Sequence, residues 1–233
     1  MNKNIPFELE TTANLSNYNR WIAESFYPFA HGSLVEIGAG IGTFSELFVD
    51  RFDSLTLIEP SSGLCEGLQK RYATENHIEI VQSSLESLIA QPAGKNFDCA
   101  LMVNVLEHIQ NDKDALRMMF NILKLGGYLL IFVPAQQSLF SELDKAVGHY
   151  RRYHLPDLKQ KVETAGFEIV KLQYLDWLGV AAWWLVNIIF KQKNINANSA
   201  VFYDRFGIPL TRWIESVIKP PFGKNLILVA KKR

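Results

Sequence analysis

The sequence predicts an α/β domain in which helices cover both faces of a seven-stranded sheet. Short apolar runs alternate with longer helical patterns, which is typical of β–α units and a parallel sheet. Several of these runs are almost continuously apolar, as expected for strands that are covered on both faces. A length of 233 residues is enough for one hydrophobic core but hardly for two full domains. We therefore expect residues 1–233 to form a single domain.

Seven runs have the composition of strands, and the last two follow a longer stretch with other patterns. The expected strands are Ser33–Gly38, Ser54–Glu59, Ile78–Gln82, Phe97–Val103, Tyr128–Val133, Phe167–Gln173 and Asn225–Ala230. We expect residues 1–32 to form an N-terminal helical cap, and residues 175–224 to form a helical insertion before the last strand.

Helical periodicity is found between these strands. From Leu116 onward, apolar side chains recur at i, i+3, i+4 and i+7, and Gly126-Gly127 ends the pattern because glycine readily adopts the left-handed conformation of a helix cap. The expected helices are Leu15–Phe29, Thr43–Asp50, Asp112–Lys124, Leu155–Ala165 and Thr211–Ile218.

Charge and cysteine content exclude several classes of protein. The 24 basic and 24 acidic side chains balance, so no overall field attracts nucleic acid, and we expect no nucleic-acid partner. Cys65 and Cys99 match neither a disulfide framework nor a metal-binding spacing, which agrees with a reducing, cytoplasmic setting. Met1–Glu10 carries acids and a proline where an export signal would need an apolar stretch, so we expect no such signal.

Trp177–Phe190 is almost wholly apolar, but it is shorter than the roughly 20 residues of a membrane-spanning helix. Three roles are open for it: a roof over a substrate pocket, a dimer contact, or docking on a membrane surface. Lys219, Lys224 and the basic C-terminus would favour anionic lipid headgroups. We therefore expect a cytoplasmic protein, with peripheral contact at the inner membrane face through residues 177–190 as an open alternative.

A glycine-rich turn follows the first strand and opens a helix. Gly38, Gly40 and Gly42 permit a tight turn and let backbone N–H groups come close to a ligand, although such turns also occur in dinucleotide-binding enzymes and in purely structural loops. Glu36 precedes the glycines, and Glu59 ends the second strand. A carboxylate at that place accepts hydrogen bonds from ribose hydroxyls.

Four further motifs follow this turn in order: Leu57-Ile58-Glu59-Pro60-Ser61, Phe97-Asp98, Asn104-Val105-Leu106-Glu107-His108 and Leu125-Gly126-Gly127-Tyr128-Leu129. The ordered series, over Leu34–Pro134, resembles that of class I S-adenosylmethionine (SAM) dependent methyltransferases. The resemblance implies a Rossmann-like sheet whose seventh strand is antiparallel, with SAM as cofactor. An NAD enzyme is the alternative, but NAD would favour a glycine where Thr43 stands, to bring its diphosphate close to the helix end.

The resemblance also implies roles for individual residues. Glu36, Gly38, Gly40 and Gly42 would line the methionine half of SAM, Glu59 would hold the ribose, and Pro60 or Ser61 would flank the adenine. Asn104 would face the methionine portion. Ser84 stands where the family often has an aspartate that contacts the adenine amine, so the contact would pass to its hydroxyl or to backbone groups. Tyr18 and Arg20, on the leading helix, would contact the SAM carboxylate.

Asn104-Val105-Leu106-Glu107-His108 is also similar to the Glu-x-x-Glu-His motif of ubiquinone-type O-methyltransferases, some of which bind a divalent ion. Here the first position is the neutral Asn104, and the loss of one carboxylate weakens the attraction for a hard cation. We therefore expect no metal site, and we expect Glu107 and His108 to be structural or to face the substrate.

Methyl transfer from a sulfonium requires mainly alignment of the nucleophile, the methyl carbon and the sulfur. An acceptor hydroxyl also needs a group that takes its proton. Because ligands lie at the carboxyl ends of such strands, His149 is the first candidate, followed by His108 and Tyr153; a histidine hydrogen-bonded in a loop is the structural alternative for His149. Arg151 and Arg152 would clamp a phosphate or carboxylate of the acceptor, or else form a solvated pair at a helix entry.

The second half of the chain is similar to bacterial methyltransferases encoded near glycosyltransferases. The similar segments are Asp144–Tyr153, Trp183-Trp184 and Pro220–Gly223. The predicted function is methyl transfer from SAM to a small-molecule, lipid-linked or glycan-linked acceptor, at an oxygen. The alternative is a catalytically silent SAM-binding scaffold or regulatory module.

Overall fold

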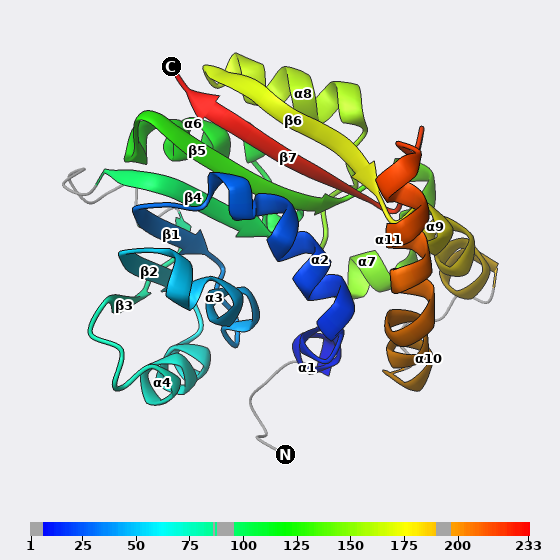
Figure 1. Ribbon diagram of the computed structural model, residues 1–233, viewed down its shortest axis with the longest axis horizontal. Coiled ribbons are helices and arrows are strands. Elements are labelled where there is room, and N and C mark those ends of the chain that lie inside the picture. Colours follow the sequence, from blue (N-terminus) through cyan, green and yellow to red (C-terminus); the bar gives the residue numbers. More distant parts are fainter. Residues whose placement is uncertain (1–6, 86, 88–95, 190–196) are drawn as a thin grey trace.

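The computed structural model describes residues 7–85, 87, 96–189 and 197–233. Its centre is one seven-stranded sheet with the order β3-β2-β1-β4-β5-β7-β6 (Figure 1). The strands are β1 Ser33–Ile37, β2 Ser54–Glu59, β3 Ile78–Gln82, β4 Phe97–Val103, β5 Leu123–Pro134, β6 Phe167–Leu175 and β7 Asn225–Lys232. The predicted fold class is confirmed.

Strands β1 to β5 are parallel, and β7 is antiparallel to both of its neighbours, β5 and β6. The antiparallel seventh strand was implied by the family resemblance. From β1, the strands β2 and β3 are added toward one edge of the sheet, and from β4 onward the strands are added toward the opposite edge. Ligands of such sheets bind where this change of direction separates the loops that follow two neighbouring strands. Here those loops follow β1 and β4, which pair up to Ile37 and Met102.

Helices cover both faces of this sheet. They are α1 Phe7–Ala13, α2 Ser16–Phe26, α3 Thr43–Phe48, α4 Ser62–Arg71, α6 Asp112–Ile122, α7 Glu142–Ala146, α8 Leu155–Thr164, α9 Trp177–Trp183, α10 Ala197–Phe202 and α11 Ile208–Val217. Figure 1 shows α2 in front of the strands and α6 and α8 behind them.

The alternation of side chains along the strands produces two buried layers. In β5, Leu129 and Ile131 pack in the layer that contains residues of α6 and α8, whereas Leu130 and Phe132 pack in the layer that contains residues of α2, α3 and α4. Because successive side chains of a strand point to opposite faces, an apolar residue at every position requires cover on both sides. The two layers together form the core.

Two helix ends differ from those predicted. The helix predicted to reach Lys124 ends at Ile122, because Leu123 already pairs with Phe97 in the sheet. The helix predicted over Leu15–Phe29 is α-helical only to Phe26 and continues as a short 3₁₀ turn. Strand pairing and Pro28 therefore override the helical periodicity at these ends.

The insertion between β6 and β7 contains α9, α10 and α11, with π-helical segments at Trp184–Ile189 and Tyr203–Gly207. The buried Asp204 carboxylate ties it to the N-terminal helices, because it accepts hydrogen bonds from the backbone N–H groups of Asn17 (3.1 Å) and Tyr18 (2.8 Å). In the described ranges no helix combines the length and the apolar character that crossing a bilayer requires. Phe190, the end of the predicted apolar segment, lies outside the described residues.

Candidate functional site

The glycine turn has the left-handed backbone that favours glycine. The φ angles of Gly38, Gly40 and Gly42 are +71°, +58° and +84°. A Cβ atom at Gly38 would lie only 2.7 Å from a methyl carbon of Val105, in the loop after β4. The glycines therefore allow the loops after β1 and β4 to approach each other closely.

The N–H groups of this turn bind within the protein. Those of Gly38 and Ala39 both donate to the carbonyl of Ile58, at 2.8 and 3.1 Å, and that of Gly40 donates to Oε2 of Glu59 at 2.9 Å. The sequence suggested that N–H groups of the turn would donate to a ligand, but these three already donate within the protein. The turn supplies close backbone approach and fixes Glu59.

Glu59 ends β2 and is buried. Its Oε2 accepts from Gly40, and its Oε1 accepts from the backbone N–H of Ser61 at 2.9 Å. Each carboxylate oxygen keeps a further lone pair, so the group can also accept hydrogen bonds from two ribose hydroxyls. Pro60 is exposed beside it, at the start of α4. These residues fit the ribose and base of an adenosyl ligand.

Glu36 lies in β1, with 3% of its surface exposed. Burial raises the pKa of its carboxyl to about 7; the hydrogen bond from the Ser45 hydroxyl opposes this shift, and the nearby Glu59 adds to it. The Ser45 hydroxyl donates to Oε2 at 2.5 Å. Because this pKa lies near neutrality, Glu36 can either accept or donate a hydrogen bond beside the glycine turn.

Two other predicted cofactor residues lie at strand ends. Asn104 follows β4 in the left-handed region, with φ of +52°, and its N–H donates to the carbonyl of Phe132 at 2.9 Å. A non-glycine residue in this region is strained, and such strain is often found at functional sites. The Ser84 hydroxyl, after β3, accepts from the N–H of Ser87 at 3.2 Å. Ser84 thus caps the turn that follows.

The leading helix is placed differently from what the sequence suggests. The Tyr18 hydroxyl donates to Oδ1 of Asn225 at 2.7 Å, at the start of β7, and Arg20 is exposed. It is α1 that comes close to the glycine turn: a Cβ at Gly40 would lie 3.7 Å from Leu9. We therefore leave Tyr18 and Arg20 out of the site proposed below.

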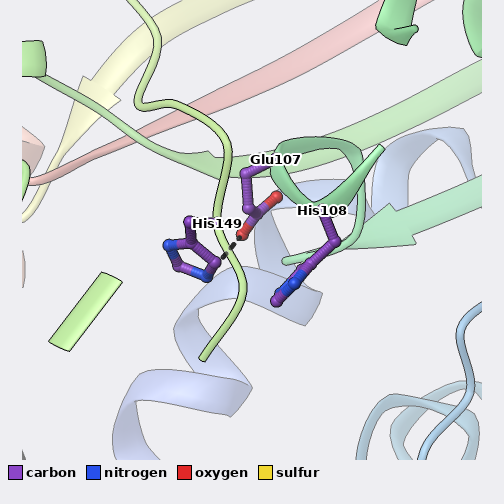
Figure 2. Close-up of side chains that lie close together, drawn as sticks. All are labelled: Glu107, His108 and His149. Atoms are coloured by element: carbon purple, nitrogen blue, oxygen red, sulfur yellow. Dashed lines mark ion pairs between the residues drawn. The ribbon is translucent and has the colours of Figure 1, made fainter. Parts of the chain in front are cut away.

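Two of the three predicted catalytic residues lie together, as Figure 2 shows. His108 ends the 3₁₀ turn Leu106–His108 after β4, and its ring lies 4.5 Å from that of His149, centroid to centroid. Nδ1 of His149 is 2.9 Å from Oδ1 of Asp144. This hydrogen bond orients the imidazole and leaves Nε2 directed toward Glu107 at 3.8 Å.

Glu107 is a site residue whose environment could not be predicted from the sequence. It is fully buried, and neither of its carboxylate oxygens has a hydrogen-bond partner within the described part of the chain. Burial raises its pKa to about 8, although the nearby Arg152 cation opposes the shift. A buried carboxylate without partners is rare and requires a physical explanation.

Asp144 is held from several sides. Its Oδ2 accepts from the N–H and the hydroxyl of Ser141, both at 2.8 Å, and Arg152 forms a buried ion pair with its Oδ1 at 2.9 Å. Burial alone would raise the pKa of Asp144, but the hydrogen bond from His149 and the Arg152 cation lower it below its usual value. Asp144 is therefore an ionised, fixed partner for His149.

Arg151, Arg152 and Tyr153 make internal contacts. Arg152 is buried in its ion pair with Asp144, and its guanidinium stacks on Trp183 at 4.4 Å. It is therefore neither available to bind a substrate nor part of a solvated pair at a helix entry, the two roles predicted from the sequence. Arg151 pairs with Asp112 at 2.7 Å. The buried Tyr153 hydroxyl lies 3.0 Å from the same carboxylate. These contacts leave all three outside the site proposed below.

Comparison with known proteins identifies the family. The methyltransferase domain family matches residues 12–172, which include the glycine turn and the His108–His149 cluster. The chain belongs to this family. Its cofactor is SAM, and its fold is that of the class I SAM-dependent methyltransferases.

Individual relatives are more distant. This methyltransferase is 34% identical over 87 residues to the ubiquinone/menaquinone biosynthesis C-methyltransferase UbiE of Cronobacter sakazakii, a match that covers 37% of the chain and 33% of that relative. The chain thus matches about a third of that protein.

Solved structures share the fold at low identity. The N-methyltransferase NodS of Bradyrhizobium japonicum, in complex with S-adenosyl-L-homocysteine (SAH), is 15% identical with a TM-score of 0.59, over 98% of this chain and 89% of NodS. A SAM-dependent methyltransferase of Archaeoglobus fulgidus is 19% identical with a TM-score of 0.60, over 91% and 92% of the two chains. Both comparisons concern the fold alone.

Proposed function

We propose that this methyltransferase transfers a methyl group from SAM to an oxygen atom of a small-molecule, lipid-linked or glycan-linked acceptor. The observation that carries the proposal is the 2.9 Å contact between Asp144 and Nδ1 of His149. Since an ionised carboxylate only accepts hydrogen bonds, Nδ1 carries a proton, and in the neutral imidazole Nε2 then keeps a lone pair. A lone pair held in this way can take the proton of an acceptor hydroxyl.

The cofactor side of the proposal rests on the β1 and β2 ends. Glu59 accepts hydrogen bonds from the ribose hydroxyls, Glu36 and the glycine turn line the methionine portion, and Ser84 contacts the adenine. Asn104 lies in the strained turn after β4. In the sequence it stands after the cofactor residues of β1 and β2 and before His108. SAM supplies a methyl group already activated by a sulfonium, so the residues of this chain mainly align the acceptor oxygen with it.

The insertion supports contact with an anionic membrane surface at the inner face, which suits a lipid-linked acceptor. Large apolar side chains are exposed along it: Trp184, Leu185, Phe202, Phe206, Leu210, Trp213, Val217 and Ile218. We call these residues the insertion surface. The acids of the insertion are turned inward: Asp176 and Asp204 are buried, and Glu215 accepts a hydrogen bond from the backbone N–H of Trp177. The basic side chains of Arg205 and Lys219 are exposed. Exposed apolar and cationic groups together favour lipid headgroups.

The test is to incubate the protein with methyl-labelled SAM and a cell extract, followed by separation of lipid, small-molecule and RNA fractions. Label in a base-stable lipid or small-molecule ether supports the proposal, and label found only on RNA overturns it. His149→Ala is expected to lower the rate about 100-fold or more with SAM binding unchanged. The exposed His154, which makes no capping hydrogen bond, supplies the control variant His154→Ala. Cofactor binding without labelling would favour a silent SAM-binding module.

A further inference from the structure

Three side chains from two separate segments present possible metal-ligand atoms to one another. Glu107 and His108 come from the turn after β4, and His149 comes from the loop after α7 (Figure 2). One ligand atom of each lies within 4.8 Å of those of the other two. The backbone joins the two segments, because the N–H of Tyr150 donates to the carbonyl of Glu107 at 2.9 Å. The cluster therefore has a fixed frame.

The buried Glu107 carboxylate is an independent observation that points to a ligand. Both of its oxygens lack a hydrogen-bond partner among the described residues, and no surface is exposed through which water could solvate it. Nε2 of His149 lies 3.8 Å from Oε1, too far for a hydrogen bond. Two ligands of one zinc ion lie about 3.4 Å apart, since each is bound at about 2.1 Å. A small shift would therefore bring both onto a shared ion.

Asp144 gives His149 the surroundings of a metal-bound histidine. Histidine ligands usually donate their other ring N–H to a carboxylate, which fixes the ring and its tautomer. Here Nδ1 of His149 makes this contact at 2.9 Å, and Ser141 and Arg152 hold Asp144 in place. The lone pair of Nε2 is thereby directed toward Glu107 before any ion arrives.

We propose that Glu107, His108 and His149 bind a divalent transition-metal ion, with Asp144 as the positioning residue. Two imidazoles and one carboxylate suit zinc or a similar transition metal better than magnesium or calcium, which prefer oxygen ligands only. The proposed site revises the expectation that the chain binds no metal, because that expectation considered only the motif Asn104–His108. His149 lies 41 residues beyond His108 in the sequence, so this ligand could not be associated with that motif.

The set of three protein ligands leaves a coordination position open, as in catalytic zinc sites. This step rests on the proposed function. A metal ion held by Glu107, His108 and His149 would make a nearby acceptor hydroxyl more acidic, so that its proton would leave to water. Its oxygen then bonds to the methyl carbon of SAM, while the electrons of the broken carbon–sulfur bond return to sulfur. In a metal-loaded protein the lone pair of His149 would bind the ion, and the Lewis acidity of the ion would promote loss of the proton in its place.

The test is a titration of chelator-treated, dialysed protein with Zn²⁺ followed by calorimetry, with Co²⁺ absorption as a second readout. Wild-type protein and His154→Ala are expected to bind one equivalent. Glu107→Gln, His108→Ala and His149→Ala are expected to weaken binding at least tenfold, and Asp144→Asn by about ten- to a hundredfold. Circular dichroism and SAH binding identify variants that fail to fold.

Absence of a stoichiometric zinc site in the wild-type protein overturns the proposal. So does binding that is unchanged in both His108→Ala and His149→Ala. Because the titration needs no acceptor, its failure is distinguishable from failure of the proposed function: methyl transfer by chelator-treated protein would persist in the first case and be lacking in the second.

Discussion

At the residue scale, the two acids beside the glycine turn have different roles because their partners differ. Glu59 is fixed by two backbone N–H groups, whereas Glu36 has the Ser45 hydroxyl as partner in a buried environment. Both were expected to bind the cofactor, but only their environments indicate how. Glu59 is suited to accept hydrogen bonds from the ribose, and Glu36 is sensitive to pH near neutrality.

Replacement of Glu59 by alanine removes the acceptor of the ribose hydroxyls. Hydrogen bonds to a charged group contribute about 1.5–3 kcal/mol each, so loss of the pair should weaken SAH binding about 100-fold or more. Calorimetry with SAH measures the change, and Glu66→Ala, an exposed acid of α4, is the control. Equal affinities of the two variants would contradict the assignment of Glu59.

The raised pKa of Glu36 predicts a pH-dependent contribution to stability. The folded protein binds this proton more tightly than the unfolded chain, whose carboxyl has a pKa near 4.5, so stability is lost as pH rises from about 4.5 to about 7. The shift corresponds to about 3 kcal/mol. Relative to Glu36→Gln, the wild-type protein should be less stable at pH 8 than at pH 5, as measured by urea denaturation. A difference that does not change with pH would contradict the burial argument.

The residues of the proposed cofactor side could be predicted because they lie at or next to the carboxyl ends of strands. Glu36, Glu59 and Asn104 stand beside β1, β2 and β4, and the hydrophobic pattern alone locates those ends. The acceptor side was less predictable. The pairing of Arg152 with Asp144 and the burial of Glu107 depend on how the loop after α7 packs, and no periodicity describes that loop.

At the scale of elements, α7 and the loop that follows it depend on Asp144. This side chain caps α7 through Ser141 and neutralises the buried Arg152. Asp144→Ala leaves that guanidinium buried without its partner, and breaking a buried pair in this way costs about 3–5 kcal/mol. Denaturant unfolding measures the loss. The exposed Asp157→Ala, which removes an ion pair within α8, should cost below about 1 kcal/mol; similar losses in the two variants would contradict the buried-pair argument.

The insertion surface predicts binding to vesicles. Trp213 and Phe206 are 68% and 57% exposed, so replacing both with serine should leave the stability nearly unchanged. The double replacement should weaken binding to vesicles with anionic lipids by roughly tenfold or more, because it removes apolar surface that would be buried in the membrane. Leu125→Ser, at a residue 79% exposed on β5, is the matched control.

Co-sedimentation measures this binding, and analytical ultracentrifugation measures association. If the double variant binds vesicles as strongly as Leu125→Ser does, the membrane proposal fails. If instead a wild-type dimer dissociates in the double variant, the insertion surface is a dimer contact.

The elements that could be predicted are those with a repeating pattern. All seven predicted strands are present, because most of their residues are apolar and pack on one or both faces of the sheet. The start of β5 was missed: it begins at Leu123 rather than at Tyr128, because Leu123 pairs with Phe97. The π-helical segments of the insertion could not be foreseen, since one extra residue per turn leaves little mark on the hydrophobic pattern. The same holds for α1, whose contact with Gly40 is a tertiary one.

At the scale of the whole molecule, the residues of the proposed cofactor and acceptor sites come together where the strand order of the sheet changes direction. The loops after β1 and β4 meet at Gly38 and Val105, and the His149 loop joins them through the bond between Tyr150 and Glu107. The glycine turn follows β1, Glu59 ends β2 and the Leu106–His108 turn follows β4, so these three motifs lie at the same edge of the sheet.

Cofactor binding should therefore stabilise the entire domain. At 100 times the dissociation constant a ligand adds about 2.7 kcal/mol, which corresponds to a rise in Tm of about 5–10 °C for a protein of this size. Thermal denaturation with SAH measures the shift, and NAD at the same concentration should produce none. Equal shifts with the two compounds would contradict the fit of the site to an adenosyl sulfonium.

The carboxylate of Asp204 links the insertion to the beginning of α2, two residues after α1 and its contact with the glycine turn. A bilayer that immobilised α10 and α11 would thus restrain α2 through two hydrogen bonds, and with it the neighbouring α1, which lies next to the glycine turn. If the insertion surface binds a membrane as proposed, membrane attachment and the exchange of SAM are expected to be coupled in this fold.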